Sequence, residues 1–304
     1  MDPYVLDTPW LLRKLIVEAF ILPFRPKNSA EAYAKIWTED GSPLLTISEA
    51  LREACENSTQ APVALGMRYG QPSIEQAAQS LLAQGVSHIH IVPLYPHHAD
   101  STVTTSVELA LKVISDRVPS SIQAPFYNEQ AYIEALAQTI VPALEQPWDH
   151  LLLSYHGLPE RHLTRTDPGN HCLSDKGCCN LSNQHIPAHE TCYRHHVMET
   201  SRLLAQQLGL SSEQWSVAFQ SRLGRLPWLQ PYTDEQLKKL PEQGVKKLVI
   251  ACPAFIVDNL ETLEEIGLQG RQTFIEAGGE SFTLVPCLNA DPQWVEVFSK
   301  MLVP

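Results

Sequence analysis

The sequence predicts an α/β protein built from two related halves, each a parallel sheet flanked by helices. Three observations favour this fold: short apolar runs alternate with longer helical patterns, several of the runs are nearly continuous in valine, isoleucine and leucine, and two stretches of the first half recur in the second. Continuous apolar runs are typical of parallel strands covered on both faces. Alternation of strands with helices is typical of parallel sheets.

Six segments are predicted as strands because they are short, aliphatic and followed by turn residues or proline. In chain order they are 62–67, 88–95, 151–156, 215–220, 247–253 and 282–286. Seven segments with helical periodicity lie between or after them. These are 73–84, 101–116, 129–145, 191–208, 233–242, 259–277 and 291–302.

An internal repeat indicates that the two halves are related. VALGMRYGQP at 63–72 resembles VAFQSRLGRLP at 217–227, and GVSHIHIVPLY at 85–95 resembles GVKKLVIACPAF at 244–255. Two matches in the same order favour a duplication over chance. Sites in open α/β sheets lie outside the carboxyl ends of the strands, so we expect a ligand cleft between the halves.

The bulk composition agrees with a folded protein and excludes some classes of function. The chain has 304 residues, of which 44% are apolar and 18% charged, enough for one large domain or two smaller ones. Its formal charge of −12 argues against nucleic acid as a partner, because phosphates bind to basic surfaces. Neither a signal peptide nor a membrane-spanning run is apparent, which predicts a cytoplasmic protein whose cysteines stay reduced.

His156 is the first candidate for chemistry. It ends the apolar run 151–156 and precedes a Gly-x-Pro turn, so its side chain is expected at the carboxyl end of a strand, facing the cleft. A hydrogen-bonded structural histidine is the alternative interpretation.

Three carboxylates after the strand 247–253 are the second candidate. Asp258, a good helix N-cap residue, Glu261 and Glu265 are spaced i, i+3 and i+7, which places them on one face of a helix. A solvated helix start, favoured by the helix dipole, would explain the same pattern. Carboxylate oxygens with one imidazole suit a loosely held divalent first-row metal ion.

Five motifs together resemble the ferrochelatase family, and the resemblance covers essentially the whole chain. They are SYHGLPER (154–161), FQSRLGRLPWLQPYTDE (219–235), DNLETLEEI (258–266), GMRYGQPSIE (66–75) and LYPHHADST (94–102). The resemblance implies two Rossmann-like (chelatase-type) halves with a porphyrin cleft between them. It also implies a lyase of haem and porphyrin biosynthesis that inserts Fe²⁺, as substrate, into protoporphyrin IX to give protohaem. In the family, the positions of His156 and Glu261 handle the metal and the pyrrole protons, and Glu265 would line a route for either.

The resemblance also implies porphyrin-binding residues. Arg68 and Tyr69 match positions near the porphyrin, where arginine can bind a propionate through charge-assisted hydrogen bonds. Pocket lining or core packing are equally open for four others, which are Tyr95, Ser101, Ser221 and Trp228. Asn259 stands where many relatives have a histidine, so a second histidine ligand is in doubt.

Two other functions remain open: a non-catalytic tetrapyrrole-binding protein, and a chelatase for another metal or porphyrin such as coproporphyrin III. The presence of both His156 and Glu261 favours an enzyme, because a carrier does not need them. The oligomeric state does not follow from the sequence.

Two halves are expected, at 1–145 and 146–304, and the first lacks the family's opening strand. Family members usually have a strand and a glycine-containing loop before the stretch that matches DPYVLDTP, where this chain starts. An absent strand would leave an unpaired edge, so we expect a form extended upstream to be more stable and more active. The apolar segment 9–26 is expected either to pack on the core or to form a lip that touches the inner face of the cell membrane.

A cysteine-rich insert at 167–192 belongs to the second half. Four thiols in a short stretch of a chain without a secretory signal usually bind metal. They are Cys172, Cys178, Cys179 and Cys192. Their spacing fits no common zinc finger, four thiolates can hold a [2Fe-2S] cluster, and some bacterial ferrochelatases contain one. Zinc and free or redox-active thiols are the alternatives, while Cys55, Cys252 and Cys287 are expected in the core.

Overall fold

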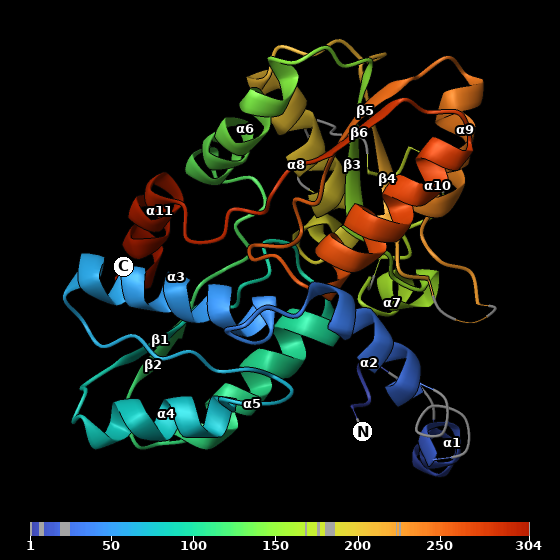
Figure 1. Ribbon diagram of the computed structural model, residues 1–304. Coiled ribbons are helices and arrows are strands. Elements are labelled where there is room, and N and C mark those ends of the chain that lie inside the picture. Colours follow the sequence, from blue (N-terminus) through green and yellow to red (C-terminus); the bar gives the residue numbers. More distant parts are fainter. Residues whose placement is uncertain are drawn as a thin grey trace.

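The computed structural model contains two parallel sheets, and it describes residues 2–5, 9–18, 25–167, 169–174, 177–179, 186–222, 224 and 226–303 (Figure 1). The larger sheet has the strand order β4-β3-β5-β6, and the smaller one pairs β1 with β2. The strands are β1 (Ile89–Ile91), β2 (Ser120–Ile122), β3 (His150–His156), β4 (Trp215–Gln220), β5 (Lys247–Ala251) and β6 (Ser281–Leu284). Every pair is parallel, which confirms the predicted α/β class.

Helices connect the strands throughout. The α-helices are α1 (Trp10–Ile16), α2 (Arg25–Ile36), α3 (Pro43–Thr59), α4 (Ile74–Ala83), α5 (Thr105–Ile114), α6 (Gln130–Leu144), α7 (Glu160–Arg165), α8 (Tyr193–Gln207), α9 (Thr233–Glu242), α10 (Arg271–Glu276) and α11 (Pro292–Leu302). Wider or tighter turns form η2 (Asp100–Thr104), η3 (Pro187–Glu190) and η4 (Glu261–Gly270). The seven predicted helical segments all contain helix, because their apolar periodicity matches the faces that pack on the sheets.

The core is built on both faces of β3. Leu151 and Leu153 are fully buried in one cluster with Val197 and Leu204 of α8, whereas Leu152 is buried in a second cluster with Leu237 of α9. Alternate residues of a strand point to opposite faces, so this central strand is covered by different helices on its two sides. Because both of its faces are covered, β3 has a continuous apolar sequence.

The last helix returns to the first part of the chain. Trp294 and Phe298 of α11 belong to the same buried cluster as Leu51 of α3, Phe126 and Tyr132. Figure 1 shows α11 lying between α3 and α6. A boundary near residue 145, which remains a prediction, would therefore leave α11 packed against elements that precede it.

The strand predicted at 62–67 is absent, and that prediction was wrong. Val63, Ala64 and Leu65 are only half-buried, and Met67 alone forms a bridge, with Ser73. A strand needs a hydrogen-bonded partner, and none pairs with 62–66 among the described residues. The sequence reasoning also did not predict β2 and the helices α2, α3 and α7.

Both sheets lead into a π-helix, which supports the repeat seen in the sequence. The segment after β1 enters η2 and the segment after β5 enters η4. In both, the next backbone N–H reaches a carbonyl five residues back: Thr105 bonds to Asp100, and Arg271 bonds to Ile266. Such wide turns often occur at functional sites, so the ends of these two strands define where to look for one.

Candidate functional site

His156 ends β3 with one ring nitrogen held and the other left for chemistry. Its Nδ1 lies 2.6 Å from the carbonyl oxygen of Gly157. A carbonyl only accepts hydrogen bonds, so Nδ1 carries a proton, and in the neutral ring Nε2 keeps its lone pair. The main-chain carbonyl of His156 accepts a bond of 2.8 Å from the hydroxyl of Tyr193. The half-buried ring is therefore oriented as a metal ligand or proton acceptor.

The turn after His156 is shaped by glycine. The N–H of Gly157 donates to the carbonyl of Gln220 at 2.8 Å, and a Cβ on Gly157 would lie 2.9 Å from that oxygen and 3.2 Å from the ring of Trp228. Such contacts leave no room for a side chain. Trp228 thus packs behind the histidine turn, which is the core-packing alternative for this residue.

The carboxylates of η4 separate into two groups. Asp258 is buried and accepts bonds from Thr262, from Asn289 and from the N–H of Cys287. It therefore fixes the loop instead of facing the cleft with Glu261 and Glu265, and the prediction that all three share one free face was wrong.

Asn259 supplies the N-cap that was predicted for Asp258. Its side-chain oxygen accepts from the N–H groups of Glu261 and Thr262 at 2.9 and 3.2 Å. It is 7% exposed. A buried amide that is engaged in capping is not available as a metal ligand, so the position where relatives have histidine is structural in this chain.

Glu265 is held by Ser221, the residue after β4. One carboxylate oxygen accepts from the Ser221 N–H at 2.9 Å and the other from its hydroxyl at 2.6 Å. Ser221 adopts a φ of 65°, a left-handed conformation that costs energy for a residue with a side chain. Backbone strain of this kind clusters at functional sites, and here it aims both donors at one carboxylate.

The electrostatics show that the three groups lie near one another. Burial raises the pKa of Glu265, the two Ser221 donors lower it, the charge of His156 lowers it and the charge of Glu261 raises it. Burial and the charge of Glu261 also raise the pKa of Tyr33 in α2. His156 and Glu261 therefore both lie close enough to Glu265 to affect its charge, and Tyr33 is a neighbour of Glu261 that the sequence reasoning missed. Within the described residues, no three His, Cys, Asp or Glu side chains form a ready-made metal site.

A second group, from the first half, already holds a carboxylate. Arg68 and Tyr69 each bond to one oxygen of Asp2 at 2.7 Å, and Thr105 donates to the same oxygen at 2.5 Å. Tyr95 lies close enough to Tyr69 and to Arg68 for electrostatic interactions with both. These three predicted porphyrin-binding residues therefore lie together.

Ser101 lies in the adjacent η2, which links this group to the His156 side of the molecule. Asp100, the first residue of η2, forms an ion pair of 2.8 Å with Arg165 of α7. Since α7 follows the His156 turn, the ion pair joins the elements that carry the two groups.

The four cysteines of the insert gather in one buried pocket. The sulfur atoms of Cys178 and Cys179 are 3.9 Å apart, and thiol hydrogen bonds join Cys192 to Cys172 and to Cys179. Arg194 approaches the sulfur of Cys179 at 3.1 Å. Burial raises the pKa of Cys172 to about 11, so without a bound cation this thiol stays protonated at neutral pH.

Histidine rings pack around these thiols. His189 stacks on His195 and His196 stacks on Tyr127, both with ring centroids 3.7 Å apart, while Nε2–H of His171 donates to the main-chain carbonyl of Cys178 at 2.7 Å. Burial lowers the pKa of His196 to about 3, which keeps its ring neutral. His185 lies outside the described residues.

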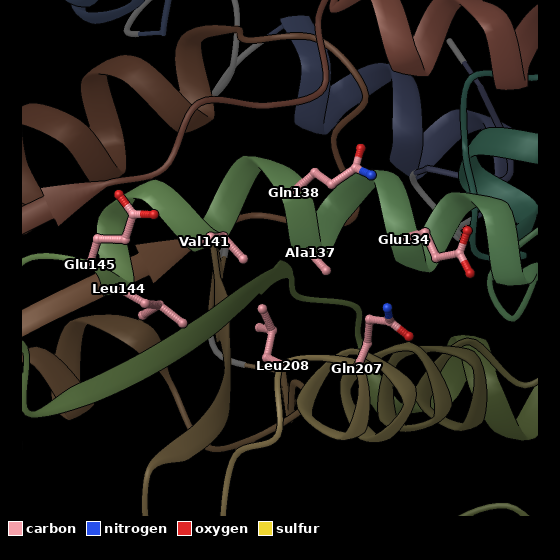
Figure 2. Close-up of a pocket in the computed structure, with 8 residues that line it drawn as sticks. All are labelled: Glu134, Ala137, Gln138, Val141, Leu144, Glu145, Gln207 and Leu208. Atoms are coloured by element: carbon pink, nitrogen blue, oxygen red, sulfur yellow. The ribbon is translucent and has the colours of Figure 1, made fainter.

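A groove of about 470 Å³ lies between α6 and the end of α8 (Figure 2). Ala137 and Leu144 of α6 face Leu208, just after α8, across it. The ends of α6 and α8 lead into β3 and β4, so the groove borders the amino ends of the strands, whereas His156 lies at a carboxyl end. It is a surface groove away from the candidate chemistry.

Comparison with known proteins identifies the family. The family model described as Ferrochelatase matches residues 1–303. A ferrochelatase of Ectopseudomonas mendocina is 52% identical over 97% of this chain and 87% of its own length, and one of Pseudomonas fluorescens is 53% identical over 99% and 89%.

Solved structures show the same fold at low identity. SirB from Bacillus subtilis with Fe³⁺ has a TM-score of 0.58 at 16% identity, over 85% of this chain and 89% of that one. The sirohydrochlorin chelatase SirB from Bacillus subtilis subspecies spizizenii in complex with cobalt has a TM-score of 0.56 at 14% identity, over 85% and 87%. These likenesses support the chelatase type of α/β fold.

We predict that Glu265→Gln weakens the pH dependence of stability. Burial raises the pKa of Glu265 above its ordinary 4.5, so the folded protein binds this proton more tightly than the unfolded chain does. The stabilising contribution is complete below 4.5 and is lost as the pH rises through the folded pKa. The free energy of unfolding in urea, measured from acidic to neutral pH, should fall less in the variant than in wild type. The variant Glu280→Gln, at an exposed position, should follow wild type. Parallel curves for Glu265→Gln and wild type would contradict the assignment.

Proposed function

We propose that this chain, which belongs to the ferrochelatase family, inserts Fe²⁺ into protoporphyrin IX at the site formed by His156, Glu261 and Glu265. The observation that carries the proposal is the convergence of one imidazole with a free Nε2 and two carboxylates at the carboxyl ends of parallel strands. Membership of the family indicates the reaction, and the structure provides an imidazole and two carboxylates that can bind Fe²⁺ or accept protons.

The reaction needs a loose site that handles both metal and protons. Fe²⁺ must lose water, and the porphyrin must release two pyrrole N–H protons as the iron enters. Nε2 of His156 can take one proton or contact the iron, because Nδ1 is already committed to Gly157. The raised pKa of Glu265 makes its carboxylate a better proton acceptor than an exposed glutamate. Few protein donors also means that the iron is released to the porphyrin and not retained.

Arg68 and Tyr69 are proposed to receive a porphyrin propionate. Their ability to bind a carboxylate is supported by Asp2, whose oxygen both residues contact at 2.7 Å. Ser221 is proposed to act through Glu265, since both of its donors are directed there. Tyr95 and Ser101 are proposed to lie at the wall of the porphyrin pocket, whereas Trp228 packs behind Gly157.

The four clustered thiols are proposed to hold a [2Fe-2S] cluster. Their shared burial, the N–H of Leu173 at 3.3 Å from the sulfur of Cys178 and the guanidinium of Arg194 at 3.1 Å from that of Cys179 fit a negatively charged thiolate cluster. Such a cluster would supply a rigid crosslink of the insert and a redox-sensitive group. Zinc would fit the same thiols but absorbs no visible light.

The helix α1 is proposed to touch a membrane surface at the cytoplasmic face. Trp10, Leu11 and Leu15 are 60%, 75% and 57% exposed, and Lys14 lies 5.6 Å from the centre of the Trp10 ring. An exposed apolar helix face beside a lysine is suited to an anionic lipid interface. None of the described helices has the length and apolar character of a membrane span.

His156→Ala is expected to lower kcat for anaerobic Fe²⁺ insertion into protoporphyrin by about 10²-fold or more, because a proton acceptor and metal contact are lost together. Porphyrin binding, followed by fluorescence, should persist. Parallel assays with Co²⁺, Ni²⁺ and coproporphyrin III test the alternative chelatases, and failure of wild type in every assay would indicate a tetrapyrrole-binding protein. Turnover unaffected by His156→Ala would discard the proposed mechanism.

Cys172→Ser and Cys192→Ser are each expected to abolish visible absorbance and acid-labile sulfide in anaerobically purified protein, because a [2Fe-2S] cluster needs four thiolates. Cys55→Ser is the matched control, since Cys55 is buried in α3, where its thiol bonds to Ser299 of α11, and its loss should leave the absorbance unchanged. Wild-type protein that lacks both signals, with or without zinc, would refute the cluster.

Leu11→Asp with Leu15→Asp is expected to reduce flotation of the folded protein with anionic liposomes severalfold, because two apolar groups would no longer enter the interface. Val141→Asp is the control, as Val141 is 43% exposed on α6, away from α1. Equal flotation of the double variant and wild type would show that α1 is not the contact.

A further inference from the structure

The π-helix η4 carries Glu261 and Glu265, so its winding determines where both carboxylates lie. A π-helix is closed by bonds from residue i+5 to residue i, and it is less favourable than an α-helix unless other contacts hold it. In an α-helix, residues i and i+5 point about 140° apart. In the wider π turn they return to nearly the same side, so an i, i+5 side-chain contact depends on the π form.

Glu264 makes such a contact. One of its carboxylate oxygens accepts from the side-chain amide of Gln269, five residues later, at 2.7 Å. The other accepts from Lys35 Nζ of α2, also at 2.7 Å. Glu264 is 2% exposed, so this carboxylate is buried between a partner on its own helix and a cation from another. Lys35 is itself half-exposed, which leaves its charge partly solvated while it neutralises the glutamate.

We propose that Lys35, Glu264 and Gln269 form a clamp that keeps η4 in its π form and thereby positions Glu261 and Glu265 beside His156. Rewinding to an α-helix would separate Gln269 from Glu264 and rotate each successive residue about the axis. Glu265 would then leave the two Ser221 donors, at 2.6 and 2.9 Å, that hold it. The three clamp residues are positioning residues and do not touch the reacting atoms.

The helix α2, which carries Lys35, also approaches η4 at a second residue. Tyr33, two residues before Lys35, lies near enough to Glu261 for their charges to interact. The contact of α2 with η4 therefore spans both Glu261 and Glu264. This inference rests on the proposed function, because it assigns the clamp a role in turnover at that site.

The test compares Lys35→Met, Lys35→Arg, Glu264→Gln and Gln269→Leu in the full-length chain. Lys35→Met and Glu264→Gln should lower kcat for Fe²⁺ insertion by about tenfold with little change in KM for porphyrin, because the reacting groups are misplaced while the cleft persists. Lys35→Arg should restore most of kcat, since it keeps the charge. Gln269→Leu, at an exposed position, should fold normally and show a smaller loss.

Lys300→Met is the matched control. Lys300 forms an ion pair of 2.9 Å with Glu296 on the exposed face of α11, and its loss should leave kcat unchanged. The acidic limb of the kcat–pH profile should move in Lys35→Met but not in Lys300→Met, a change that a purely stabilising ion pair would not produce. Wild-type kcat and pH profile in both Lys35→Met and Glu264→Gln would overturn the proposal.

Crystal structures of Glu264→Gln and Gln269→Leu separate this inference from the proposed function. Loss of the i+5 to i bonds over residues 261–270 would support the clamp even if no metal insertion were found. Unchanged π winding in both variants would refute the clamp, whatever the activity of wild type.

Discussion

The parallel pairing of β3 with β4 is the constraint on which the site depends. Its register places His156 opposite Gln220, so the residues that follow, Gly157 and Ser221, meet at the same edge of the sheet. Gly157 bonds to the carbonyl of Gln220, and Ser221 turns into a left-handed conformation that directs its donors to Glu265. A shift of one residue would reverse the faces and separate the imidazole from the carboxylates.

Buried polar contacts keep this edge rigid. The hydroxyl of Ser154 donates to the side-chain oxygen of Gln220 at 2.7 Å and lies 2.9 Å from that of Thr233. The amide of Gln220 reaches the carbonyl of Glu261 at 3.4 Å. Satisfied polar groups in a low-dielectric interior resist rearrangement, because each lost bond would leave an unpaired group. This series of hydrogen bonds thereby links β3, β4 and η4 beside the candidate site.

The helix α8 connects the cysteine-rich insert to the same strand. Tyr193 follows Cys192 and donates to the carbonyl of His156 at 2.8 Å, while Ser201 bonds to the hydroxyl of Tyr155 at 2.8 Å. Both tyrosines are fully or almost fully buried. The four thiols and His156 are thus connected through the same helix.

Much of the site could be predicted from sequence because local pattern and position carry the information. The apolar run before His156 predicts a buried strand, and the place of that residue at its end predicts a side chain at the carboxyl edge. The spacing of Glu261 and Glu265 predicts a common helix face. The gathering of Cys172, Cys178, Cys179 and Cys192 was likewise expected from their density in the sequence.

Other features depend on partners distant in the chain, and only the tertiary structure decided them. Residues 62–67 have the composition of a strand but form none, because no strand in the described part of the chain pairs with 62–66. Asp258 has the spacing of a site carboxylate, yet it accepts a hydrogen bond from the side chain of Asn289 and is buried in the loop. Glu264 looks like a solvated helix residue, but Lys35, which is 229 residues away in the sequence, buries it. The sequence by itself therefore determined β1, the strands of the larger sheet, most of the helices between them and the reactive residue types, which follow from local periodicity. Long-range hydrogen bonds and ion pairs, which have no local signature, decided which of those residues face one another.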